Sequence, residues 1–204
     1  KGRGISKATA ETLKMSNNKN VLAFNYYQDG KIVNSKYRKL EEKFMWQHAG
    51  GKQVLYNIDN LKSQEQIILV EGEFDVAAIV EVGFLNCGSV SQGAPNAGSE
   101  VSTKLSCLDN SADVIKDAKR VIIFTDEDKN GWYLEKILIE RFGADRCAIV
   151  RVPEELVNKK TDKICKDANE VLIEYGPEVL KDLILKAVDT PISGVRTVRQ
   201  VEGQ

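Results

Sequence analysis

The sequence is poor in the residues that most often bind zinc or form disulfides. It contains one histidine, His48, and four cysteines, none of them in a Cys-x-x-Cys pair. That spacing contains no recognisable zinc ribbon. We therefore expect reduced thiols that pack as small apolar side chains at Cys87, Cys107, Cys147 and Cys165.

Long apolar runs are missing as well. The longest have the length of a β-strand and fall far short of the roughly 18 residues that span a bilayer. No signal-peptide pattern opens the chain. We therefore expect a cytoplasmic protein with no membrane partner. Because the chain begins with Lys1 rather than Met, we also expect it to be a piece of a longer protein.

Charge of both signs is abundant, but it is unevenly distributed. The formal net charge is −1, yet residues 1–64 contain 12 Lys and Arg against 5 Asp and Glu, while residues 65–204 contain 17 against 25. This split is expected if the first part faces a polyanion and the second holds cations. A solvated surface is the more common cause of a charge run, so charge alone does not decide.

Residues 1–64 are expected to form a small basic α+β subdomain. A short helix is predicted for residues 4–15, with Ser6 as its N-cap. An Asp-Gly pair at 29 and 30 then predicts a β-hairpin, with strands at 21–28 and 31–38.

The second hairpin strand carries two basic residues, Lys36 and Arg38. Side chains alternate along a strand, so both are expected on one face, and we expect that face to be open. Further short strands are predicted within residues 42–56, where Lys43 and Lys52 add positive charge.

From residue 66 onward, strand-like and helix-like segments alternate. Continuous apolar strands joined by helices predict an α/β fold, with a mostly parallel sheet flanked by helices. Such sheets bind ligands beyond the carboxyl ends of their strands. Strands are expected at 67–70, 85–90, 120–125 and 147–152, and helices at 74–82, within 99–117 and at 131–142.

Acidic residues follow two of these strands directly. Glu71 ends the first, and Asp126 and Asp128 follow the third. In a parallel sheet these ends share one edge, so the carboxylates should converge. Cations must then neutralise them, and hard oxygen ligands suit Mg²⁺. Tight turns are expected at Gly72 and Gly131.

A competing explanation needs no cation. Helix N-termini favour acidic residues through capping and the helix dipole. We favour this explanation for Glu73 and Asp75. For Glu71, Asp126 and Asp128 we favour cation binding, because the same arrangement of acids follows two strands.

Three motifs in order resemble a known family. "VEGEFD", "DEDKNG" and "KDANEVL" (166–172) resemble the Toprim fold of bacterial-type primases, topoisomerases and some nucleases. The segment "YYQDGKIVNSKYRKLEEKFMW" is similar to the basic segment before Toprim in phage-type primase-helicases. The resemblance covers most of residues 20–175.

The resemblance implies roles for individual residues. Glu71, Asp126 and Asp128 would be catalytic, and together with Asp167 they would bind Mg²⁺, or alternatively Mn²⁺. Asp75 would support this site, as would Gly72 and Gly131. Template or nucleotide phosphates would face the basic residues Lys36, Arg38, Lys43 and Lys166.

The implied function is that of a DNA primase core, which makes short RNA primers on single-stranded DNA from ribonucleoside triphosphates. A helicase domain or protein would be its partner. The family's zinc-binding domain and a Walker-type motif are missing from this sequence. Two alternatives stay open: a Toprim nuclease, and a non-catalytic DNA-binding domain of a Twinkle-like helicase.

The expected domains are the basic subdomain (1–64), the Toprim domain (65–155), a helical C-terminal part (156–190) and a linker (191–204). The loop at 89–99 could offer backbone N–H groups to a triphosphate or simply connect two elements. Four aromatic residues could either stack on bases or pack in the core, and we favour core packing. They are Tyr26, Tyr27, Tyr37 and Trp46.

Overall fold

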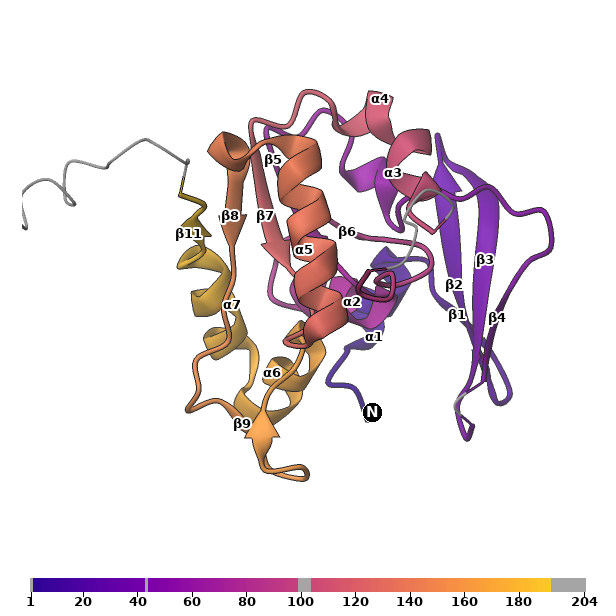
Figure 1. The fold of residues 1–204 in the computed structure, drawn as a ribbon. Helices are drawn as coiled ribbons and strands as arrows, with labels where there is room; N and C mark the ends of the chain where they lie inside the picture. Colours follow the sequence, from indigo (N-terminus) through magenta and orange to yellow (C-terminus); the bar gives the residue numbers. More distant parts are fainter. Residues whose placement is uncertain (1, 43, 99–103, 192–204) are drawn as a thin grey trace, which may run out of the picture.

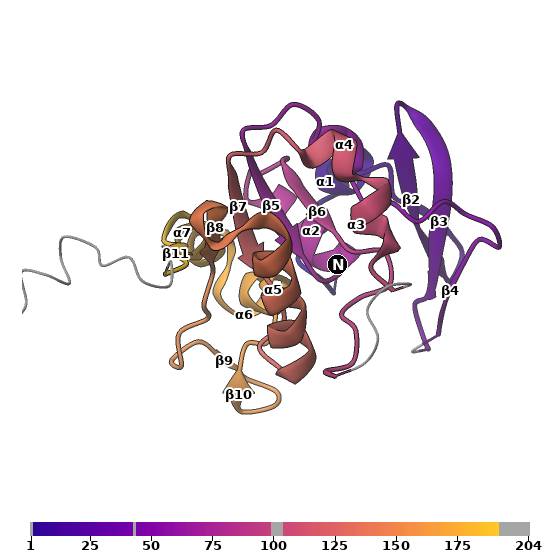
Figure 2. The same ribbon diagram turned by 45° about the horizontal axis from the view of Figure 1, so that its top comes forward.

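The computed structural model describes residues 2–42, 44–98 and 104–191, and two sheets dominate this part of the chain. A four-stranded antiparallel sheet lies beside a five-stranded, mostly parallel sheet that is flanked by helices (Figures 1 and 2). The predicted α/β fold with a preceding α+β part is therefore confirmed. Lys43 and residues 192–204 of the predicted linker lie outside the described residues.

The larger sheet consists of β5 (Gln66–Val70), β6 (Cys87–Ser89), β7 (Arg120–Phe124), β8 (Cys147–Ile149) and β11 (Val188–Asp189). The strand order is β11-β8-β7-β5-β6. The central strands β5 and β7 are parallel to each other, and residues 67–70 and 121–124 are buried. Helices cover both faces of such strands, so their side chains are apolar without alternation.

The helices packed with this sheet are α2 (Glu73–Glu81), α5 (Lys129–Phe142), α6 (Ala168–Tyr175) and α7 (Pro177–Leu185). In Figure 1, α5 lies in front of β5 and β7, and α2 lies behind them. Right-handed crossovers explain this arrangement, because the chain leaves the central strands in opposite directions to reach β6 and β8. A short connection joins each helix to the strand before it, since β5 ends at Val70 and β7 ends at Phe124.

The single helix predicted within residues 99–117 is not what the structure shows. The described residues there form two short helices, α3 (Ser106–Asn110) and α4 (Ala112–Ile115). Ser111 interrupts them, and its hydroxyl accepts a hydrogen bond from the Leu55 amide at 3.0 Å. A long-range contact therefore breaks the local pattern.

The smaller sheet consists of β1 (Ser16–Asn18), β2 (Val21–Gln28), β3 (Lys31–Lys39) and β4 (Met45–Gln47), and it follows helix α1 (Lys7–Thr12). The Ser6 hydroxyl caps α1, as predicted. The hairpin is also confirmed, with left-handed φ angles of 51° at Asp29 and 74° at Gly30. Several short strands were expected within residues 42–56. Among the described residues of that range, β4 is the one strand that forms.

The inner face of this sheet packs on the start of α2. Phe24 and Tyr26 are fully buried, and the Phe24 ring meets Phe74 edge-on at 5.1 Å between centroids. Two 3-10 helices, η1 (Ile58–Asn60) and η2 (Ala144–Arg146), and a short hairpin of β9 (Val157–Asn158) and β10 (Lys163–Ile164) complete the described chain. The inner face thus looks toward the carboxyl ends of β5 and β7.

Two expectations from composition can be compared with the structure. All four cysteines are free and buried, as predicted. No helix among residues 2–42, 44–98 and 104–191 is long and apolar enough to cross a membrane. The boundaries of the four expected domains stay a prediction.

Gly131 lies in the first turn of α5, where the helix comes very close to the end of β7. A Cβ at Gly131 would lie 2.0 Å from the Asp126 carbonyl oxygen. The glycine is therefore needed for close approach, not for the tight turn that we expected. Gly72 does not form the expected tight turn either. It is the N-cap of α2 and has an extended φ of −131°.

We expect Gly131→Ala to destabilise the protein by roughly 1 to 3 kcal/mol, the usual cost of overpacking. A loss of stability would be informative, because helix propensity alone favours alanine over glycine by about 1 kcal/mol. The measurement is the free energy of unfolding in urea. Gly2→Ala is the control, since a Cβ there meets nothing within 4 Å. Equal stability of both variants would contradict the close approach.

Candidate active site

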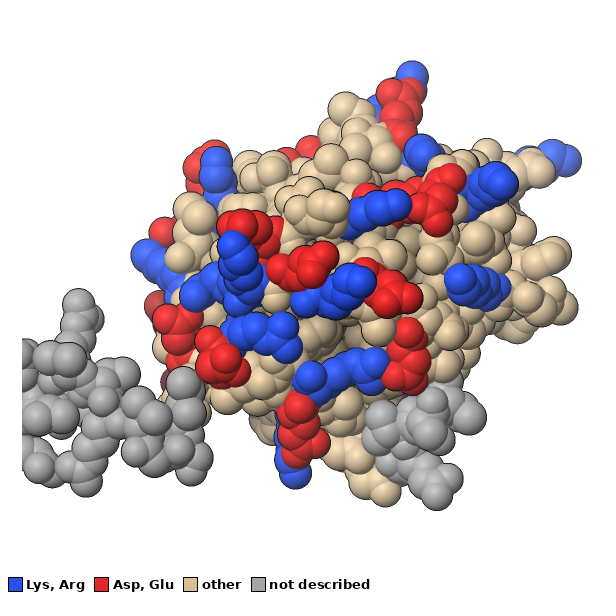
Figure 3. Space-filling view, turned by 90° about the horizontal axis from the view of Figure 1, so that it is seen from above, with Lys and Arg blue, Asp and Glu red and all other residues tan. Residues whose placement is uncertain are grey.

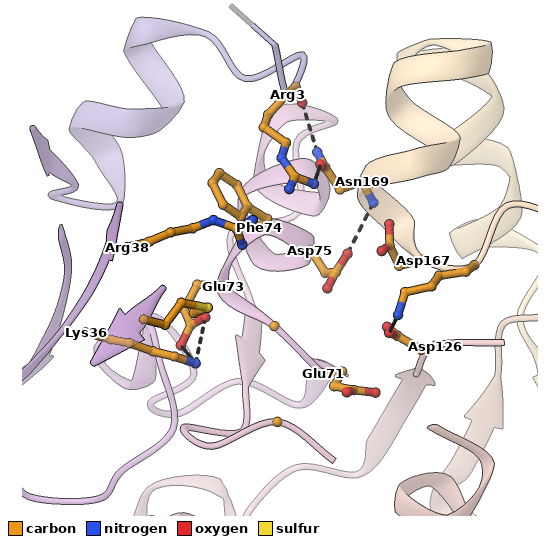
Figure 4. A pocket seen from close by; sticks show the side chains of 14 residues that line it. Arg3, Lys36, Arg38, Glu71, Glu73, Phe74, Asp75, Asp126, Asp167 and Asn169 are labelled. Atoms are coloured by element: carbon orange, nitrogen blue, oxygen red, sulfur yellow. Dashed lines mark hydrogen bonds and ion pairs between the residues drawn. The ribbon is translucent and has the colours of Figure 1, made fainter. Parts of the chain in front are cut away.

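A pocket of about 230 Å³ lies between the carboxyl ends of β5 and β7 and the inner face of the smaller sheet. Two opposed groups of charged side chains line it, as Figure 4 shows. We call the first group the acidic wall: Glu71, Asp75, Asp126 and Asp167. We call the second group the basic wall: Arg3, Lys36 and Arg38.

Glu71 follows β5 directly and is largely buried. Its Oε1 accepts a hydrogen bond from the Ala94 amide at 3.2 Å, while its buried Oε2 accepts none from the described part of the chain. Burial, together with the charge of Asp126, raises the pKa of Glu71 to about 7. One carboxylate oxygen at the pocket is therefore left without compensation.

Asp126 and Asp128 follow β7, and Lys166 bridges them. The Lys166 Nζ lies 2.5 Å from Asp126 Oδ2 and 3.8 Å from Asp128 Oδ2. Burial raises the pKa of Asp126. Burial also opposes charge on Asp128, but hydrogen bonds from the Gly131 and Asn130 amides lower its pKa below the ordinary value. Through these bonds Asp128 is also the N-cap of α5.

Asp167 and Asp75 bring the third acidic motif to the first. Asp167 is the N-cap of α6 and accepts a hydrogen bond from the Glu170 amide at 2.7 Å. Asp75 accepts one from the Asn169 amide at 3.2 Å. Burial raises the pKa of Asp167 to about 6 and also raises that of Asp75, and nearby carboxylates add to both shifts. The capping explanation thus holds for Asp167, which lines the pocket as well.

These residues fit a divalent cation. Carboxylate oxygens are the ligands that Mg²⁺ prefers, and Glu71 has an uncompensated buried oxygen. Among the described residues, no three His, Cys, Asp or Glu side chains are already placed to hold a metal ion. The ammonium of Lys166 instead lies against Asp126 and Asp128. The predicted ligand set, Glu71, Asp126, Asp128 and Asp167, stays a prediction.

Lys36 and Arg38 share a face, as predicted, but that face is not open. The Lys36 Nζ donates to both carboxylate oxygens of Glu73, at 2.9 and 3.1 Å, and its side chain is only 14% exposed. The Tyr26 hydroxyl also donates to Glu73. The expectation of an open face was wrong at Lys36, because Glu73 on α2 packs against it and neutralises its charge. Arg38 is half-buried and lines the pocket.

Arg38 shares the ring of Phe74 with Arg3, which sequence reasoning missed. The two guanidinium carbons lie 5.4 and 4.6 Å from the ring centroid. Burial and the charge of Arg3 lower the pKa of Arg38. Arg3 is fixed by Asn169, 166 positions away, with hydrogen bonds of 3.0 and 2.8 Å in both directions. No local pattern in the sequence marks Arg3.

The loop after β6 connects the two acid-bearing turns. Its Ala94 amide donates to Glu71, and its Ala97 amide donates to Asn130 Oδ1 at 3.1 Å in the first turn of α5. These two amides are therefore engaged within the protein. The connecting role that we considered for residues 89–99 accounts for them.

The raised pKa of Glu71 predicts a pH-dependent stability in metal-free buffer. A carboxyl whose pKa rises from 4.5 to about 7 on folding binds its proton more tightly in the native state. Its contribution to stability is complete below pH 4.5 and is lost as the pH rises through 7. We expect the unfolding free energy to fall over this range, by at most roughly 3 kcal/mol for Glu71.

Urea unfolding with EDTA at several pH values measures this slope. Glu71→Gln should flatten it, because glutamine does not titrate, whereas the exposed Glu41→Gln should not change it. A slope that survives in Glu71→Gln would show that other groups cause it.

The position of Lys166 predicts that it competes with divalent cations. Lys166→Met removes the ammonium from Asp126 and Asp128, so we expect Mn²⁺ to bind about tenfold or more tightly. Electron paramagnetic resonance of free Mn²⁺ measures this affinity without any reaction. Lys163→Met loses the same charge on the exposed β10 and is the matched control. Equal effects of both variants would mean that only overall charge matters.

Comparison with known proteins identifies relatives of the chain. A family model, Toprim domain, matches residues 66–173. The chain is 39% identical over 204 residues to the Arabidopsis thaliana "Twinkle homolog protein, chloroplastic/mitochondrial", covering 95% of this chain and 28% of that protein. It is 40% identical over 179 residues to the "Primase homolog protein" of the same plant, covering 84% and 52%. The chain thus spans only part of each.

Solved structures show the same fold. The primase fragment of the bacteriophage T7 primase-helicase superposes with a TM-score of 0.70 at 20% identity, covering 89% of this chain and 70% of that one. The Aquifex aeolicus primase, with zinc-binding and RNA polymerase domains, gives 0.65 at 18% identity, covering 91% and 54%. The residues matched by the Toprim family model, 66–173, include Glu71, Asp126 and Asp167. This match shows that the chain belongs to the Toprim domain family.

Proposed function

We propose that this chain is the catalytic core of a DNA primase, which joins ribonucleotides into short primers on single-stranded DNA. The observation that carries the proposal is the pocket itself, in which the acidic wall faces the basic wall. A nucleoside triphosphate would use both walls, because the basic wall neutralises phosphate charge directly and the acidic wall would do so through the divalent cation that it holds. A match to primase fragments in fold and a relative named as a primase homolog support the same function.

In this reaction a 3′-hydroxyl attacks the α-phosphate and pyrophosphate leaves. When bound, Mg²⁺ would neutralise charge that develops on the attacking and leaving oxygens. Glu71, Asp126 and Asp128 would hold it, with Asp167 as a further ligand. Glu71 would also be a candidate base for the proton of the attacking hydroxyl, through the carboxylate oxygen that does not hold the cation.

The two arginines of the basic wall, Arg3 and Arg38, would bind the nucleotide's phosphates. Arg3 and Arg38 repel each other across Phe74, and an anion between them would relieve that repulsion. Arginine is well suited to phosphate because its donors form a planar fork. Lys36 would instead position β3, since Glu73 already engages its ammonium.

The face seen from above is not marked by charge as a nucleic-acid-binding surface. In Figure 3, Lys and Arg lie interspersed with Asp and Glu over the face seen from above, without a large patch of one sign. The argument for phosphate binding therefore rests on the pocket. Lys43, assigned to phosphate binding from the sequence, lies outside the described residues and stays a prediction.

A second candidate is the DNA-binding domain of a Twinkle-like helicase that makes no primers, because a named relative is a Twinkle homolog. The retained Glu71, Asp126, Asp128 and Asp167 argue against it. A nuclease would use the same acids, but it would not need Arg3 and Arg38 opposite them. A helicase domain or protein is the proposed partner in either case. The predicted cytoplasmic location stays a prediction, since that relative's name is chloroplastic/mitochondrial.

The proposal predicts that Glu71→Gln and Asp126→Asn each lower nucleotide transfer by roughly 100-fold or more, since the metal supplies several kcal/mol. The assay contains Mg²⁺, labelled ribonucleotides and an RNA primer already annealed to single-stranded DNA, so initiation is not required. Both strands are inspected for extension and cleavage. Asp113→Asn, an exposed acid outside the pocket, is the control.

Each outcome distinguishes the candidates. Extension that both variants lose supports the primase. DNA cleavage without extension would contradict it in favour of a nuclease, and DNA binding without either reaction would favour the accessory domain. Unchanged extension in both variants would remove the catalytic role of these acids.

A further inference from the structure

The loop that follows β6 touches both walls of the active-site pocket. We call residues 91–94 the bridging loop. At its start, the Ser91 carbonyl accepts a hydrogen bond from Lys36 Nζ of the basic wall at 3.3 Å. At its end, the Ala94 amide donates to Glu71 Oε1 of the acidic wall at 3.2 Å. The position of this loop therefore affects both groups of charged side chains.

A closed ring of hydrogen bonds holds the start of the bridging loop. The Ser91 hydroxyl donates to Gln53 Oε1 at 2.8 Å, and Gln53 Nε2 donates to Gln47 Oε1 at 3.2 Å. Gln47 Nε2 then donates to the Ser91 carbonyl at 3.0 Å, which closes the ring. Both glutamines use their oxygen and their nitrogen within the ring, so each side-chain amide is held in one orientation. The ring ties the loop to β4, the edge strand of the smaller sheet.

Gln53 is the member of the ring that is anchored to the core. Its carbonyl accepts a hydrogen bond from Asn110 Nδ2 at 2.7 Å, and the next residues, Val54 and Leu55, are fully buried. Its Oε1 accepts a further hydrogen bond from Gln92 Nε2 in the bridging loop, at 3.3 Å. Gln53 is not among the described residues that line the pocket, so it would act on the pocket through the loop.

The carboxylate of Glu71 depends on the bridging loop for its orientation. Among the described residues, the Ala94 amide is the only hydrogen-bond donor to it. Residues 91–94 belong to no helix or strand, so side-chain contacts must fix this amide. The far side of the loop is held by Lys104 Nζ, which donates to the Ala94 carbonyl at 2.8 Å. The ring holds the side that faces the smaller sheet.

We propose that Gln53 is a positioning residue for Glu71. Through the ring, it holds the bridging loop where the Ala94 amide orients the Glu71 carboxylate. The inference rests on the proposed function, in which Glu71 holds the divalent cation. Removing a group that orients a metal ligand from outside changes metal affinity or activity by roughly 10- to 100-fold. The ring would therefore contribute to cation binding although none of its members touches the cation.

Gln53→Leu opens the ring while keeping a side chain of similar size. We expect Mn²⁺ to bind about tenfold more weakly, because the Glu71 carboxylate loses its orientation. Electron paramagnetic resonance of free Mn²⁺ measures this affinity without any reaction. Asn86→Leu is the matched control, since it removes a side-chain amide that donates to the Gln66 carbonyl at 2.6 Å, but at the amino end of β6. Wild-type Mn²⁺ affinity in a folded Gln53→Leu would overturn the proposal.

A second substitution tests whether the ring acts as a unit. Ser91→Ala opens the same ring at another bond, so it should also weaken Mn²⁺ binding. The double variant should bind Mn²⁺ no more weakly than Gln53→Leu alone, because residues of one network are not additive. Losses that add in the double variant would contradict the ring. If Gln53→Leu fails to fold, Gln47→Leu opens the ring from the edge strand, and wild-type affinity there would overturn the proposal.

Failure of this inference differs from failure of the proposed function. Primer extension by the wild type, with unchanged Mn²⁺ affinity in Gln53→Leu, would contradict the positioning role alone. Weakened Mn²⁺ binding in Gln53→Leu, without primer extension by the wild type, would contradict the primase alone. A wild type that binds no Mn²⁺ would contradict both.

Discussion

The buried carboxylate of Glu73 holds the two sheets together. It is only 4% exposed, and it accepts hydrogen bonds from Tyr26 on β2 and from Lys36 on β3. Removing one partner of such a buried pair typically costs about 3 to 5 kcal/mol, because the remaining charge is left without compensation. The distance between the acidic and basic walls depends on this contact, since Arg38 lies on the same strand as Lys36.

The acidic wall and Asp128, which lies outside the pocket lining, combine two uses of carboxylates. Asp128 and Asp167 cap α5 and α6 with one oxygen each, so they satisfy backbone amides that would otherwise lack partners. Their neighbours Glu71 and Asp126 lie at strand ends, where burial and mutual repulsion disfavour the charged form. Capping and cation binding are therefore not exclusive. The helix N-termini reduce the cost of assembling four acids at one pocket, and Lys166 neutralises part of what remains.

Much of this arrangement follows from the sequence. Apolar runs ending in Glu71, Asp126 and Asp128 predict parallel strands with three converging acids at one edge. Glu71 and Asp126 do line one pocket, whereas Asp128 is not part of its lining. The Asp-Gly hairpin is equally local. Arg3 could not be predicted, because its position depends on Asn169, 166 residues away. The engagement of Lys36 was missed for the same reason, since alternation gives the face of a side chain but not what packs against it.

The first turn of α2 gives three consecutive residues three different neighbours. Glu73 contacts the smaller sheet, Phe74 supports the two arginines, and Asp75 binds the start of α6. Each α-helical residue turns the chain by about 100°. An insertion or deletion of one residue here would therefore redirect all three contacts at once, even if composition were preserved. Change in length at this turn should therefore be rare among homologous chains.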